Sequence, residues 1–166
     1  MKFIYSFLIL TVLSSNLFAA GGESSGTSGG GEDVSKSNYK QAVSLIKRAG
    51  KLEKKDKIDK AKKLYSQAFQ KLEKAHKSDK KNPDILNYMG FTTRKVGNFE
   101  QAEKYYLKGL NIKPNHNGIN EYLGELYVQT NRINKANERL EVLKGCNCEE
   151  YKELELIIKT KGSKVY

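Results

Sequence analysis

The sequence predicts an all-α protein made of stacked helical hairpins, and two observations carry this prediction. The segment Asn87 to Phe91 is echoed 34 residues later by Glu121 to Glu125, and Ala102 recurs as Ala136 at the same offset. Around these positions, apolar residues recur at steps of three and four, as on the buried face of an amphipathic helix. A period of this length is typical of a two-helix unit that buries its apolar face against its neighbours.

The chain begins with a segment that is typical of export. Lys2 precedes an apolar run from Phe3 to Leu13, and small residues follow at Ala19 and Ala20. This is the layout of a secretory signal peptide over residues 1–20, and the run is shorter than the roughly 20 residues that span a bilayer. We expect an exported protein, periplasmic if bacterial, with no stable membrane span in the mature chain. The alternatives are a secreted protein and one held by an uncleaved N-terminal segment.

A Gly- and Ser-rich segment follows over residues 21–37, and its composition predicts a flexible linker. A first, irregular hairpin is expected over residues 38–82. Its small residues fit the repeat in two frames, one starting at Ala42 and one at Ala49, seven residues or two helical turns apart. Both frames put the same face inward, so we predict an elongated second helix from about Ile58 to His76.

Two regular hairpins are expected over residues 83–116 and 117–150. Gly90 and Ala102 are small, which lets the two helices of a hairpin approach closely, and Pro114 ends the second helix. The helices are predicted at residues 39–54, 58–77, 84–96, 99–111, 118–129 and 133–144.

The turns inside these hairpins have recognisable residues. Gly97 is free to take a left-handed conformation, and Asn98 can cap the helix that follows it. We expect Asn131 to take the same capping role in the next hairpin.

A last helix is expected near residues 149–160, within a capping segment that spans residues 149–161. Glu149 and Glu150 in its first turn are favourable against the helix dipole. An array of repeats needs such a helix to cover its apolar end. Its polar outer side is expected to be formed by Lys152, Glu153, Glu155 and Lys159.

Residues 83–116 resemble the tetratricopeptide repeat. The residues that carry the resemblance are Leu86, Met89, Gly90, Ala102, Tyr106, Gly109 and Pro114. The resemblance implies a right-handed α-solenoid of about three hairpins plus a C-terminal capping helix. It also implies a concave groove, lined by the first helix of each hairpin, that binds a protein or peptide partner. The positions that would line this groove are Asp84, Asn87, Phe91, Arg94, Glu121, Glu125 and Val128.

The groove residues also indicate what the groove does not bind. The family's clamp for acidic carboxyl tails uses Lys, Asn and Arg at such positions, whereas Glu121 and Glu125 would repel a carboxylate. Phe91 has two interpretations that stay open here. It either packs as core, or it anchors an apolar side chain of the partner next to carboxylates that suit a basic residue.

The sequence offers little material for catalysis. His76 and His116 are the only histidines, both are expected at the surface, and no nucleophile–histidine–carboxylate spacing is present. We therefore expect no enzyme, no catalytic residue and no cofactor. Cys146 and Cys148 could form a local disulfide, stay as thiols, bridge two chains or act in redox chemistry. With no nearby histidine they offer too few ligands for zinc, so no metal is expected.

The net charge of +11 is unevenly spread. Residues 36–81 hold sixteen Lys and Arg against five acids, whereas residues 117–158 hold five against eight. The lysines are scattered along helices, so no nucleic acid is expected as a partner. The favoured function is an exported, non-catalytic scaffold or adaptor. The alternative is an envelope-associated protein that binds an anionic surface or polymer through its Lys-rich N-terminal helices. Head-to-tail self-association of the basic and acidic ends is a further hypothesis.

Overall fold

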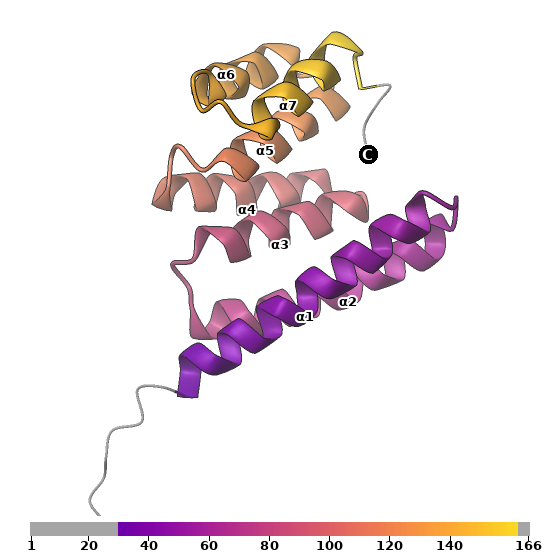
Figure 1. Ribbon diagram of the computed structural model, residues 1–166, viewed down its shortest axis with the longest axis vertical. Helices are drawn as coiled ribbons and strands as arrows, with labels where there is room; N and C mark the ends of the chain where they lie inside the picture. Colours follow the sequence, from indigo (N-terminus) through magenta and orange to yellow (C-terminus); the bar gives the residue numbers. More distant parts are fainter. Residues whose placement is uncertain (1–29, 163–166) are drawn as a thin grey trace, which may run out of the picture.

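The computed structural model describes residues 30–162, and within this range the chain forms α-helices and no strand (Figure 1). The predicted signal peptide and the first part of the predicted linker lie outside the described residues. The helices are α1 (Gly30–Glu53), α2 (Ile58–Ser78), α3 (Pro83–Lys95), α4 (Phe99–Ile112), α5 (Asn117–Gln129), α6 (Ile133–Leu143) and α7 (Glu149–Lys159). The predicted all-α class is confirmed.

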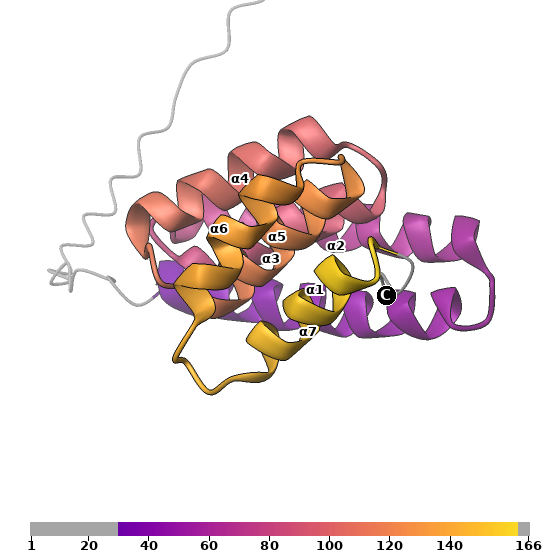
Figure 2. The same cartoon turned by 90° about the horizontal axis from the view of Figure 1, so that it is seen from above.

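Consecutive helices pair as hairpins, α1 with α2, α3 with α4 and α5 with α6, and the hairpins stack in chain order (Figure 1). α7 covers the far end by packing against α5 and α6. The first hairpin is longer than the other two, and its connecting turn projects past them (Figure 2). None of the helices in the described part is long and apolar enough to cross a membrane.

The N-terminal end of α1 corrects the expected linker. The linker was expected to reach residue 37, but α1 begins at Gly30. Ser35 is buried and its Oγ donates a hydrogen bond to the Ala75 carbonyl oxygen at 3.2 Å. The Tyr39 ring lies 5.8 Å from the ring of Tyr88. Contacts with α2 and α3 thus stabilise turns of α1 whose local composition favours coil.

Small side chains set the spacing inside the first hairpin. Its α1–α2 interface contains five alanines that are fully buried, with Tyr65 and Leu72 filling the volume beside them. Because no side chain extends beyond Cβ at these positions, the two helices can approach closely. The five are Ala42, Ala49, Ala61, Ala68 and Ala75. Ala42 and Ala49 are both buried, as the two overlapping frames of the repeat require.

Glycines allow the closest contacts in the rest of the stack. A Cβ atom on Gly90 would overlap the ring of Tyr106, which is fully buried across the α3–α4 hairpin. The equivalent Gly124 contacts the side chain of Leu154, which comes from α7 rather than from α6. The two glycines therefore have different partners, one within its own hairpin and one in the capping helix.

The turns confirm one expectation and correct another. Gly97 has a left-handed φ of 95°, and the Asn98 side chain accepts a hydrogen bond from the Gln101 amide, as predicted. Asn131 also has a left-handed φ, of 58°, so it does not cap α6. The N-cap of α6 is Arg132, which makes no side-chain capping bond. At an offset of 34 residues Asn131 is the equivalent of Gly97, and Asn tolerates this conformation better than most residues.

Gly90→Ala should lower the free energy of unfolding by roughly 1–3 kcal/mol, because the added methyl group collides with a buried ring that has no room to move. Gly50→Ala is the matched control. Its Cβ would meet nothing nearer than the Tyr65 hydroxyl at 4.0 Å, so the better helix propensity of alanine should leave stability equal or slightly higher. Urea unfolding of both variants checks this, and equal effects would contradict the close α3–α4 contact.

Candidate partner-binding groove

A pocket of about 670 Å³ opens on the side of the molecule where the first helices of the hairpins meet α7. α1 contributes one wall, α3 the middle, and α5 with α7 the opposite wall, while the start of α2 closes one end. The residues that line it are Ile46, Gly50, Glu53, Lys54, Ile58, Tyr65, Phe91, Arg94, Lys95, Glu121, Tyr122, Glu125 and Glu153. We call this pocket the groove.

Three aromatic rings form the centre of the groove. Phe91 lies between Tyr65, whose ring centroid is 5.8 Å away in an edge-on arrangement, and Tyr122, whose centroid is 4.9 Å away. Such tilted and edge-on pairs are favourable beyond the area that they bury. Phe91 is only partly buried and also lines the groove. Phe91 therefore packs against Tyr65 and Tyr122 and at the same time exposes part of its ring to the groove.

One cation of the groove, Arg94, is held by two aromatic rings and a carboxylate together. The Arg94 guanidinium lies 5.6 Å from the centroid of Phe91 and 5.7 Å from that of Tyr122. Its Nη2 is 2.6 Å from Glu125 Oε2, and its Nη1 donates a hydrogen bond to Gln129 Oε1. The Arg94 and Glu125 side chains are only 1% and 7% exposed, so this ion pair is buried. Burial raises the pKa of Glu125 more than the guanidinium lowers it.

A second cation is held in the same manner at the other end of the groove. Lys95 Nζ is 2.9 Å from Glu53 Oε2 and lies 5.7 Å from the centroid of Tyr65. The Tyr65 hydroxyl donates a hydrogen bond to the same Glu53 oxygen at 2.9 Å. This pair links α3 to α1 across the groove, so the first hairpin is fixed to the second by charge as well as by apolar packing.

The acidic wall of the groove holds a carboxyl group that keeps its proton. Glu121 is 3% exposed, and burial raises its pKa to about 10, helped by a hydrogen bond with Glu153 and by the nearby charge of Glu125. At neutral pH Glu121 is therefore a neutral acid that can donate a hydrogen bond to Glu153. We call these two residues the Glu121–Glu153 pair.

The structure divides the seven groove positions implied by the family resemblance. Four of them line the groove, namely Phe91, Arg94, Glu121 and Glu125. The other three do not: Asn87 and Val128 are buried, and Asp84 is exposed outside the groove. Asp84 accepts a hydrogen bond from His116, Asn87 is buried next to Gly118, and Val128 is buried within the core of the last two hairpins. The start of α5 thus covers Asn87, whereas Asp84 stays exposed.

Several groove residues were not expected from the sequence. Glu153 was assigned to the outer side of the capping helix, but it faces the groove next to Leu154, which fills the space at Gly124. Tyr122 follows Glu121 directly and contacts Phe91. The sequence does contain one indication of this position. Glu153 directly precedes Leu154, an apolar residue of the capping helix that points toward the stack, so the Glu153 side chain lies at the edge of the same buried face.

His116 corrects another expectation. It was expected at the surface, but it is 9% exposed and caps α5. Its Nδ1 accepts a hydrogen bond from the Ile119 amide at 3.2 Å, so the Nε2 carries the proton and donates to Asp84 Oδ1 at 3.0 Å. The imidazole is therefore a connection between the second and third hairpins.

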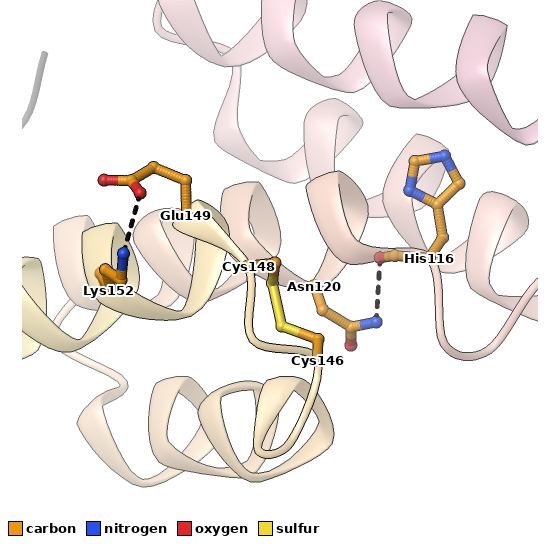
Figure 3. The surroundings of a disulfide bond; sticks show 6 residues. All are labelled: His116, Asn120, Cys146, Cys148, Glu149 and Lys152. Atoms are coloured by element: carbon orange, nitrogen blue, oxygen red, sulfur yellow. Dashed lines mark hydrogen bonds and ion pairs between the residues drawn. A yellow bond between two sulfur atoms is a disulfide. The ribbon is translucent and has the colours of Figure 1, made fainter.

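Cys146 and Cys148 form a disulfide in the loop between α6 and α7 (Figure 3). The bridge closes a ring with one residue, Asn147, between the two cysteines, and Asn147 takes a left-handed φ of 48°. Cys148 is also the N-cap residue of α7. In Figure 3 the bridge lies between Asn120 and Glu149, and neither cysteine lines the groove.

Comparisons with known proteins show a likeness to the tetratricopeptide repeat over part of the chain. Residues 89–116 match the family model of the tetratricopeptide repeat. No curated protein matches the sequence. Among solved structures, the tetratricopeptide domain of Arabidopsis OM64 is 16% identical with a TM-score of 0.48, over 74% of this chain and 98% of that chain.

Two further structures have a similar arrangement. The Yersinia enterocolitica type III secretion chaperone SycD, in complex with a peptide of the translocator YopD, is 16% identical with a TM-score of 0.45, over 72% of this chain and 87% of that chain. The second tetratricopeptide domain of human RPAP3, in complex with an HSP70 peptide, is 18% identical with a TM-score of 0.45, over 74% and 98%.

Glu125→Leu should lower the free energy of unfolding by roughly 3–5 kcal/mol, because it leaves the Arg94 guanidinium buried without its counter-charge. The double variant Arg94→Met with Glu125→Leu removes both charges and should recover much of that loss. Urea unfolding of the single and double variants gives the comparison. A single variant as stable as the wild type would show that the pair is not buried in solution.

Glu121→Gln should be more stable than the wild type, by a margin that grows as the pH rises. Folded Glu121 holds its proton up to about pH 10, whereas the unfolded chain loses it near 4.5, so wild-type stability falls between these values. The non-titrating glutamine removes this fall, which amounts to at most about 1.4 kcal/mol per pH unit.

Urea unfolding at several pH values from 5 to 9 measures this margin. Glu138→Gln, a change at an exposed carboxyl on α6, is the control and should show no such trend. A margin for Glu121→Gln that stays constant with pH would contradict the raised pKa of Glu121.

Proposed function

The chain contains a tetratricopeptide repeat within an all-α stack of helical hairpins, and from this premise we propose that it is a non-catalytic scaffold or adaptor. In this proposal the groove between α1, α3, α5 and α7 binds a segment of a protein or peptide partner. The observation that carries the proposal is the aromatic centre of the groove, where Phe91 stays partly exposed between Tyr65 and Tyr122.

The chemistry of the groove suits a peptide segment. Binding energy at protein interfaces concentrates at aromatic and arginine residues in pockets that exclude water. Here Phe91 and Tyr122 offer ring surface, and Ile58, which is 44% exposed, adds apolar surface at the end of the groove.

The walls of the groove are already in place without a partner. The Arg94–Glu125 and Lys95–Glu53 pairs fix the side chains of the middle helix against both walls. A site whose side chains are held in position loses less conformational entropy on binding. The groove is therefore suited to recognise a partner with little rearrangement of its own.

We also propose that the protein is exported. The N-terminal apolar segment motivates this part of the proposal, and the disulfide between Cys146 and Cys148 supports it, because disulfides persist mainly in oxidising compartments. In a bacterium the corresponding compartment is the periplasm.

A second candidate function rests on the charge of the first hairpin. The exposed side of α1 and α2 carries many lysines, which could bind an anionic surface or polymer. They include Lys40, Lys47, Lys51, Lys62, Lys63, Lys74 and Lys77. Binding of this kind would fall steeply with ionic strength, whereas binding in the groove would depend mainly on the aromatic residues.

Phe91→Ala should weaken partner binding by more than about 1 kcal/mol, because it removes the central ring of the groove. Peptides selected from a random displayed library on the full-length protein supply the probe, and calorimetry gives the affinities. Leu107→Ala, which removes an exposed apolar side chain from α4, is the control and should bind as the wild type does.

The affinities are compared without denaturant, at a temperature at which circular dichroism shows that both variants are folded. Selected peptides that bind equally well to Phe91→Ala would contradict the groove as the binding site. Binding that ignores Phe91 and collapses between low and physiological salt would support the second candidate instead.

A further inference from the structure

The groove holds its own cations in a recurring arrangement. Arg94 and Lys95 each lie near aromatic rings and each form an ion pair with a glutamate that also lines the groove, Glu125 and Glu53. A positive charge in such a position gains from the ring face and from the carboxylate together.

A third place in the groove combines carboxyl groups with a nearby aromatic ring, but no Lys or Arg side chain of the described residues pairs with these carboxyl groups. The Glu121–Glu153 pair lies on the α5–α7 wall, and Glu121 is followed directly by Tyr122, whose ring lines the same groove. No basic side chain of the described part forms an ion pair with either carboxyl group. The two groups contact each other instead. Arg94, the nearest guanidinium on α3, is already bound to Glu125 and Gln129.

From this geometry, and resting on the proposed function, we infer that the groove recognises a partner segment by a lysine or arginine side chain, which docks between the Glu121–Glu153 pair and the ring of Tyr122. The apolar residues of the segment then contact Phe91 and Ile58. The partner is thus a basic and apolar peptide segment, and an acidic tail would be rejected by the same carboxyl groups.

The chemistry of the pair favours a cation over other occupants. Glu121 keeps its proton because burial, the hydrogen bond with Glu153 and the neighbouring carboxyl groups all disfavour its charged form. An ammonium or guanidinium group can replace that proton, since its charge compensates both carboxylates and its N–H groups bond to them. Binding then releases the proton to solvent. The charged groups around Glu121 and along the groove are Arg94 and Lys95 on α3, Glu125 on α5, Glu150 and Glu153 on α7, Glu53 on α1, and Lys54 in the turn that follows α1.

The test uses the peptides selected on the full-length protein whose binding depends on Phe91. We expect them to be enriched in Lys or Arg at one position next to apolar residues. Replacing that basic residue by Gln should weaken binding at least about ten-fold. Glu121→Gln and Glu153→Gln in the protein should weaken binding of the basic peptide by a similar factor and leave the Gln peptide almost unchanged. Glu138→Gln, outside the groove, should change neither.

Calorimetry at pH 7 in two buffers of different ionisation enthalpy supplies an independent readout. Binding of the basic peptide should release close to one proton, and binding to Glu121→Gln should release none. If Phe91-dependent peptides lack a basic residue, or bind Glu121→Gln and Glu153→Gln as tightly as the wild type, this inference is overturned while the groove remains the binding site. If no selected peptide depends on Phe91, the proposed function fails and the inference fails with it.

Discussion

The close approach of helices at positions with little or no side chain is the constraint on which the rest of the structure depends. In the first hairpin the α1–α2 interface contains alanines, and in the second the ring of Tyr106 lies directly on Gly90. These contacts fix the spacing and the register of each hairpin. A larger side chain of one helix fits against the other only where the opposite residue is small, so few relative positions of the two helices are possible. The register then decides which residues of α1, α3 and α5 face the groove.

The groove combines this apolar framework with charges that would be costly elsewhere. A buried ion pair such as Arg94–Glu125 often contributes little net stability, because both charges lose their hydration. Its value here is positional: the guanidinium holds Phe91 and Tyr122 in place and connects α3 to α5. The Lys95–Glu53 pair does the same between α3 and α1. The small residues thus bring the helices together, and the ion pairs fix the positions of the side chains that line the groove.

The sequence predicts the fold well because the fold follows from local patterns. The 34-residue offset, the small residues at helix crossings and the turn at Gly97 all act within one hairpin or between neighbours. The site is predicted only in part. Whether Asn87 faces the groove depends on how the start of α5 lies over it. The role of Glu153 depends on how α7 packs against the stack. The same holds for the beginning of α1, which long-range contacts of Ser35 stabilise against its local composition. These features are set by packing between elements that no sequence period relates.

The contact between Leu154 and Gly124 also sets the length of the array. α7 packs on α5 and α6, in the place where the first helix of a fourth hairpin would stack, and Leu154 fills the gap that such a helix would use. A second copy of the chain could continue the stack at this end only after α7 had left it. The number of repeats is therefore determined by one short helix that begins directly at the disulfide, and the open growth that repeat architectures permit stops at that helix.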